Sequence, residues 1–208
     1  MLFRSEDKKT HIPTHALTST TRELLYLSEL VQKMFEPVIE LFEKWDKPLI
    51  NELKALELEV NSVHQRVKDY VTEVIRHNIT EEELKRSHEL IMYADNMEAA
   101  GDVIVKNLFK LAAAQNKKAL IFSDKGREEL TTLHERILVN MQLAMNVLLS
   151  SDLESARQLV QEKGIVGTMV LESHRNHLDR LRDGDPASLR SSNIHIERSE
   201  EHTSELQS

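Results

Sequence analysis

Three carboxylates, Asp95, Glu98 and Asp102, follow one another at steps of three and four residues in a segment without proline. These steps place all three on one face of a helix, one above another. Like charges held this close repel each other. The face therefore needs a bound cation, basic neighbours or full contact with water. The spacing alone is compatible with a cation site and with a solvated acidic surface.

The chemistry open to such a site is limited by composition. The chain has no cysteine, so disulfides and thiolate metal ligands are excluded. A metal would be held by carboxylate, imidazole or water, which favours Mg²⁺, Mn²⁺, Fe or Zn²⁺. His174 and His177 share a helix face, but Glu172 is not at the spacing of a di-iron motif, so this pair is the weaker candidate.

Three heptad seams surround the carboxylates and predict long helices over residues 20–45, 48–77 and 81–114. Thr20 and Thr80, each followed three residues later by Glu, are predicted N-caps, and Pro37 is expected to kink the first helix. The seams are Leu24, Leu27, Val31, Met34, Val38, Leu41 and Trp45; Leu49, Leu53, Leu56, Val60, Val63, Val67, Tyr70 and Val74; and Leu90, Ala94, Met97, Gly101, Ile104, Leu108 and Leu111. Gly101, with its alanine neighbours, leaves a thin patch that another helix can approach closely.

The second half of the chain repeats this plan less completely. Ser123 can cap a fourth helix, a fifth spans residues 153–182, and a sixth would open at residues 188–197. We predict an all-α protein of two tandem three-helix, spectrin-repeat-like bundles. Residues 1–17 form a flexible lead-in, residues 18–116 the first bundle and residues 117–197 an incomplete second bundle.

Three segments carry a resemblance to a known family. They are "ALTSTTRELLYLSELVQKMFEPV" (residues 16–38), "ELEVNSVHQRVKDYVTEV" (residues 57–74) and "ADNMEAAGDVIVKNL" (residues 94–108). In this order they resemble the PhoU family, in the variant found at the cytoplasmic C-terminus of bacterial sodium/phosphate cotransporters. The resemblance covers about residues 16–197.

The resemblance implies a regulatory module in phosphate ion transport and homeostasis, without catalytic residues. It would lie on the cytoplasmic side of the inner membrane, its partners being the membrane transport domain of the same parent chain and, in a homodimer, a second copy. Glu98 and Asp102 match the family's metal-binding E-x-x-x-D step, with Asp95 one turn earlier. Glu57 on the second helix stands at the matching spacing, although Asn61 replaces the usual acid there.

The last eleven residues, 198–208, depart from this pattern. "RSEEHTSELQS" is similar to an in-frame translation of a sequencing-adaptor oligonucleotide, and we exclude it as an artefactual, disordered tail. The second bundle is then truncated, and we expect it to be less stable than the first.

The net charge of −8 argues against nucleic acid as a partner. No run of about 18 apolar residues predicts a membrane span, and no signal peptide is recognised. Two alternatives to the regulatory module stay open: a carboxylate-bound metalloprotein, and a helical scaffold without a ligand.

Overall fold

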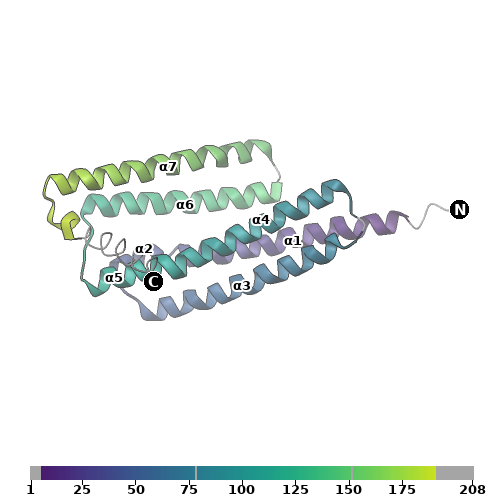
Figure 1. The fold of residues 1–208 in the computed structure, drawn as a ribbon, viewed down its shortest axis with the longest axis horizontal. Helices are drawn as coiled ribbons and strands as arrows, with labels where there is room; N and C mark the ends of the chain where they lie inside the picture. Colours follow the sequence, from purple (N-terminus) through teal and green to yellow (C-terminus); the bar gives the residue numbers. More distant parts are fainter. Residues whose placement is uncertain (1–5, 78, 151, 191–208) are drawn as a thin grey trace, which may run out of the picture.

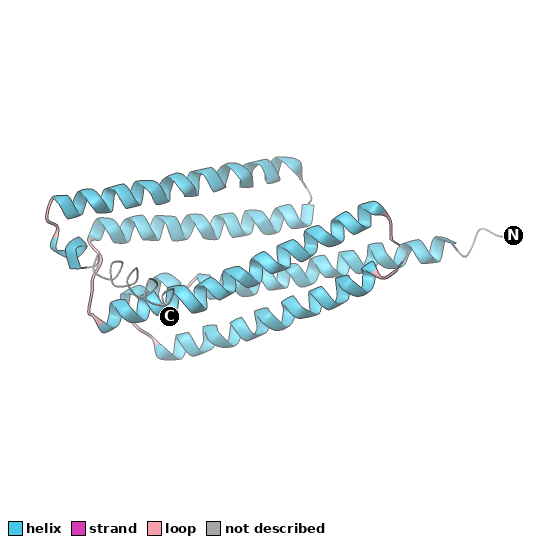
Figure 2. Ribbon diagram, in the orientation of Figure 1, coloured by secondary structure: helices cyan, strands magenta, loops and turns pink. Residues whose placement is uncertain are grey.

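The computed structural model describes residues 6–77, 79–150 and 152–190, and every regular element within them is helical (Figures 1 and 2). Their order is α1 (Glu6–Phe35), α2 (Val38–Glu43), α3 (Lys47–Ile75), α4 (Glu81–Val103), a π-helical turn η1 (Ile104–Leu108), α5 (Phe109–Lys117), α6 (Asp124–Ser150) and α7 (Leu153–Arg182). The predicted all-α class is confirmed.

The first helix begins earlier than the sequence pattern predicts. Helix α1 starts at Glu6, so residues 6–17, for which a flexible lead-in is predicted, are helical, and Thr20 lies inside the helix instead of capping it. The Thr20 hydroxyl instead donates to the carbonyl oxygen of Ala16, one turn upstream, at 3.0 Å. Ala16, Leu17 and Thr20 are all buried. Because this turn is buried, the helix begins before Leu24, the first residue of the predicted heptad seam.

Pro37 ends α1 instead of kinking it, which corrects the prediction of one helix over residues 20–45. Proline has no N–H to continue the helical hydrogen bonds, and the chain resumes as the short helix α2 after a turn at Glu36 and Pro37. The seam nevertheless continues, because Val38 and Leu41 are buried. Trp45, the predicted last residue of the seam, lies beyond α2 and is 39% exposed.

Helix α3 matches its predicted range to within two residues, and α4, η1 and α5 together match the range predicted for the third long helix to within three. The N-termini of α3 and α4 explain where the two segments begin. The side chain of Asp46 accepts from the backbone N–H of Leu49 at 3.1 Å, and a proline follows in the first turn. At α4 the predicted capping box is formed. Thr80 Oγ1 accepts from the Glu83 N–H at 3.2 Å, and the Glu83 carboxylate accepts from the Thr80 N–H at 2.9 Å.

The π-helical turn η1 shifts the buried face of the third long helix. Up to Ile104 the predicted seam is right, with Leu90, Ala94, Gly101 and Ile104 buried. A π-helical turn adds a residue to the helical repeat, so the buried positions advance from Leu108 and Leu111 to Phe109 and Ala112. The periodicity contains no signal for this change.

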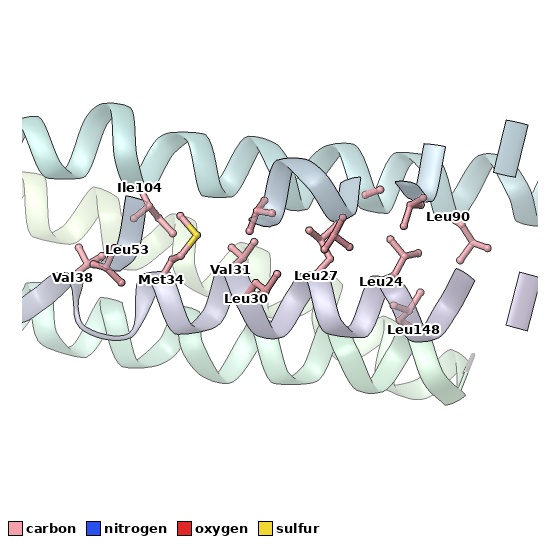
Figure 3. Close-up of a cluster of buried hydrophobic side chains, with 14 of the residues drawn as sticks. Leu24, Leu27, Leu30, Val31, Met34, Val38, Leu53, Leu90, Ile104 and Leu148 are labelled. Atoms are coloured by element: carbon pink, nitrogen blue, oxygen red, sulfur yellow. The ribbon is translucent and has the colours of Figure 1, made fainter. Parts of the chain in front are cut away.

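Helix α1 is the centre of the fold, because α3, α4 and α6 all pack against it. Leu24, Leu27, Val31 and Met34 lie along it with almost no exposure (Figure 3). Gly101 lies where α4 crosses this core: a Cβ built there would stand 3.4 Å from Cγ1 of Val60. The predicted close approach of a neighbouring helix at Gly101 is thus present.

Helices α6 and α7 form an antiparallel pair joined to the first unit through α6 (Figure 1). Helix α7 packs chiefly on α6 and has no buried residue. Of the predicted sixth helix, residues 186–190 are helical, and the Asp185 carboxylate accepts from the Ser188 N–H at 2.7 Å. The remainder of that helix and the predicted tail of residues 198–208 lie outside the described residues.

Candidate functional site

The acidic face of α4 divides into two charge clusters. In the first, Asp95 Oδ1 lies 2.7 Å from His64 Nε2 and 3.4 Å from Lys68 Nζ, both on α3. The hydrogen bond from His64, more than that from Lys68, holds the pKa of the Asp95 carboxyl below its usual value. Asp95 is therefore satisfied by bases from the neighbouring helix.

The second cluster gathers around Lys106, one turn after Asp102 on the same face. Lys106 Nζ lies 2.6 Å from Asp102 Oδ2, and this hydrogen bond raises the pKa of the ammonium group. The charges of Glu98 and Glu57 raise that pKa further, so both carboxylates lie near the same cation. Glu57 also accepts a hydrogen bond of 2.7 Å from Asn61 Nδ2.

Lys106 is thus hydrogen-bonded to Asp102 and is under the charge influence of Glu98 and Glu57, whereas Asp95 has its own partners on α3. Among residues 6–77, 79–150 and 152–190, no group of three or more His, Asp or Glu side chains is arranged to hold a metal ion. Lys106 supplies this face with the positive charge for which a bound cation was predicted. The metal site stays a prediction, and a divalent ion there would have to displace Lys106.

Three basic residues, Lys106, His64 and Lys68, pair with carboxylates of the acidic face, and none of them was predicted as a site residue from the sequence. Lys106 could have been found, because it lies four residues after Asp102 and an Asp–Lys pair at this spacing meets on a helix surface. His64 and Lys68 could not, since their contact with Asp95 depends on how α3 and α4 align.

A separate polar cluster, away from the acidic face, joins α7 to α6. Arg180 donates two hydrogen bonds to the Glu129 carboxylate, at 2.7 and 3.2 Å, while Ser173 and Asn176 add bonds of 2.9 and 3.1 Å. Burial alone would raise the pKa of Glu129, but the hydrogen bonds from Arg180, Ser173 and Asn176 outweigh it and the pKa is lowered. Further along the pair, Arg136 and Glu162 are joined by bonds of 2.6 and 2.7 Å.

Between this helix pair and the first unit lies a mainly apolar groove of about 440 Å³. Its floor includes Ser28 and Tyr93, whose hydroxyls are 2.8 Å apart, and burial raises the pKa of Tyr93. Asn140 also lines the groove, and its buried Oδ1 has no hydrogen-bond partner among the described residues. Lys163 lies at the exposed rim.

Comparison with known proteins identifies the class of helical bundle. Residues 24–108 match the model of the PhoU domain, and this range takes in the C-terminal part of α1, all of α2–α4, η1 and the whole acidic face. Residues 24–108 thus match the PhoU domain, and the predicted resemblance to the PhoU family is confirmed.

Similar full-length proteins are known from enteric bacteria. The "Putative inorganic phosphate export protein YjbB" of Salmonella typhimurium (strain LT2), of Escherichia coli (strain K12) and of Shigella flexneri are each 29% identical to this chain over 184 residues. The match covers 88% of the chain but only 34% of each relative, so the chain spans about a third of their length. No solved structure matches the chain. None of the helices within the described ranges is both long and apolar enough to cross a membrane.

Proposed function

We propose that this chain is a non-catalytic regulatory module of a protein that moves inorganic phosphate across a membrane, and that it acts in phosphate homeostasis. The observation that carries the proposal is the PhoU domain at residues 24–108, in a chain related to proteins named for phosphate export. About two thirds of each of those relatives lies outside the matched region, and a transport part would belong there.

The finer proposal is that the module lies on the cytoplasmic side of the inner membrane and regulates a sodium-dependent phosphate transporter in the same polypeptide. The character of the acidic face supports a regulatory role over a metalloenzyme. Asp102 is paired with Lys106, and Asp95 with His64 and Lys68. This pairing suits an electrostatically balanced surface better than an open coordination site.

A segment exchange tests this proposal. In the Escherichia coli relative, the region that aligns with this chain is deleted or replaced by the chain, and both proteins are expressed in cells without other phosphate exporters. Uptake and release of radiolabelled phosphate are measured with sodium or potassium outside the cells. We expect the deletion to change phosphate flux, the replacement to restore it, and the flux to depend on sodium.

A matched pair of variants separates a folded module from a passive segment. Leu53→Asp places a charge in the core of α3, where the side chain is 2% exposed, while Leu58→Asp makes the same change on the same helix at 68% exposure. The Escherichia coli relative that carries this chain should lose the restored phosphate flux when the chain has Leu53→Asp, and should keep it when the chain has Leu58→Asp. Equal phosphate flux with and without the segment would overturn the regulatory role. Phosphate flux that is the same in sodium and in potassium would overturn only the proposal that the transporter depends on sodium.

A further inference from the structure

The groove between the α6–α7 pair and the first unit has the size of a small-molecule site. Its volume of about 440 Å³ falls within the range of about 300–1,000 Å³ that is typical of such sites. On α6 its lining runs from Ile137 to Ala144, seven residues of helix or about 10 Å. Met97 of α4 and Met141 of α6 belong to its apolar walls. Methionine side chains are flexible and can adjust to a ligand.

The hydroxyl groups at the floor of the groove offer a hydrogen-bond acceptor. Ser28 Oγ donates its only proton to the carbonyl oxygen of Leu24, at 2.8 Å. The Tyr93 hydroxyl, 2.8 Å from Ser28 Oγ, must then donate to it, and the Tyr93 oxygen keeps its own lone pairs. A polar group of a ligand at this floor is therefore favoured when it donates a hydrogen bond.

Asn140 adds a second acceptor, and this one lacks a partner. Asn140 lines the groove, and its Oδ1 is buried without a hydrogen bond from any of the described residues. Buried side-chain oxygens nearly always accept a hydrogen bond, and a buried acceptor without one is unfavourable. Because an amide oxygen cannot donate, the partner that fits Asn140 Oδ1 is an O–H or N–H group.

Lys163 gives the rim of the groove a positive charge. It forms no ion pair within the described part of the chain, and none of the described residues that line the groove is acidic. Ser173 of α7 binds Glu129 of α6. Eleven residues further along α6 and ten residues back along the antiparallel α7, Asn140 and Lys163 come to about the same level. One ligand can therefore reach both, with a hydroxyl group at Asn140 and an acidic group at Lys163.

We propose that the groove binds a hydroxy acid about 10 Å long. Its hydrocarbon chain lies between the helices, its hydroxyl group donates to Asn140 Oδ1, and its carboxylate pairs with Lys163. Such a ligand would contact Tyr93 and Met97 of the first unit together with α6 and α7, so its binding would strengthen the attachment of the helix pair. The site is separate from the acidic face, and its ligand does not depend on the proposed role in phosphate transport.

NMR of the full chain with labelled methionine methyl groups tests the proposal. The probe is 3-hydroxyoctanoate, and its matched controls are octanoate, which lacks the hydroxyl group, and 1,3-octanediol, which lacks the acid. The Met97 and Met141 signals should shift with a dissociation constant of about 1 mM, while the signal of Met34, in the core of the first unit, should not. Octanoate should bind about fivefold more weakly than the probe, and the diol about threefold more weakly.

Two variants assign each polar group of the ligand to its partner. Asn140→Leu should abolish the preference for 3-hydroxyoctanoate over octanoate, and Lys163→Met should abolish its preference over the diol. Lys54→Met, which changes an exposed lysine on α3, should keep both preferences.

The wild type alone can overturn the proposal, whether or not the variants fold. Met97 and Met141 signals that do not shift at about 20 times the expected dissociation constant would do so. Equal affinities for 3-hydroxyoctanoate and octanoate, the result expected if water alone binds Asn140 Oδ1, would also overturn it, as would equal affinities for the probe and the diol. Folded Asn140→Leu or Lys163→Met protein that keeps the wild-type preferences would contradict it as well.

Discussion

Arg180 is the residue whose removal should most weaken the attachment of α7. Its side chain is 15% exposed and holds Glu129, itself 21% exposed, through bonds of 2.7 and 3.2 Å. In Arg180→Met the Glu129 carboxylate would keep only Ser173 and Asn176 as partners. Breaking a fully buried ion pair costs about 3–5 kcal/mol, but two remaining bonds and partial exposure reduce the expected loss here to about 2 kcal/mol.

Hydrogen exchange of the α7 amides, followed by mass spectrometry, measures this loss directly. A decrease of about 2 kcal/mol corresponds to opening about 30-fold more often. The matched control is Arg182→Met, two residues on, which removes an exposed pair with Asp179 and should change little. The double variant Arg180→Met/Glu129→Leu replaces both partners by apolar groups and should recover most of the loss.

The reasoning would be refuted if Arg180→Met had no more effect than Arg182→Met, or if the double variant lost as much as the single one. Acid gives an independent check. Because the pKa of Glu129 is lowered, its contribution to stability is complete above the usual carboxyl value of about 4.5 and disappears as pH falls through the lower folded value. Hydrogen-exchange protection of the α7 amides should therefore decline only at acidic pH.

Three further outcomes are expected. Gly101→Leu should lower the melting temperature, because overpacking against Val60 costs about 1–3 kcal/mol and outweighs the better helix propensity. Thr80→Ala should cost about 1 kcal/mol in denaturant unfolding, since it removes the α4 capping box. By NMR titration, the Asp95 carboxyl should have a pKa below its usual 3.8, and His64→Leu should raise it towards that value.

Much of the fold was predictable because heptad periodicity records which side of a helix is buried. Leu53 and Val60 on α3, and Leu90 and Ala94 on α4, were assigned to the core and are buried there. The prediction failed where the helical repeat itself changes: after η1 the buried position moves from Leu108 to Phe109. No count along the sequence detects an added π-helical residue in advance.

The candidate site was predictable only within one helix. Steps of three and four residues place Asp95, Glu98 and Asp102 on one face of α4, and they could equally have located Lys106. The separation of Asp95 from the other acids depends on His64 of α3, which reaches it across the helix pair. Such contacts follow from the alignment of two helices in space, which the spacing within either sequence does not contain.

The assignment of Lys106 as the cation of the acidic face is tested most directly by melting temperatures with EDTA and with Mn²⁺. The account predicts that the wild type melts at the same temperature in both. Lys106→Met, which leaves Glu57, Glu98 and Asp102 without that ammonium group, should melt lower in EDTA and recover when Mn²⁺ binds. A wild type that Mn²⁺ stabilises, with the effect abolished by Glu98→Gln/Asp102→Asn, would contradict the account and establish a metal site on this face.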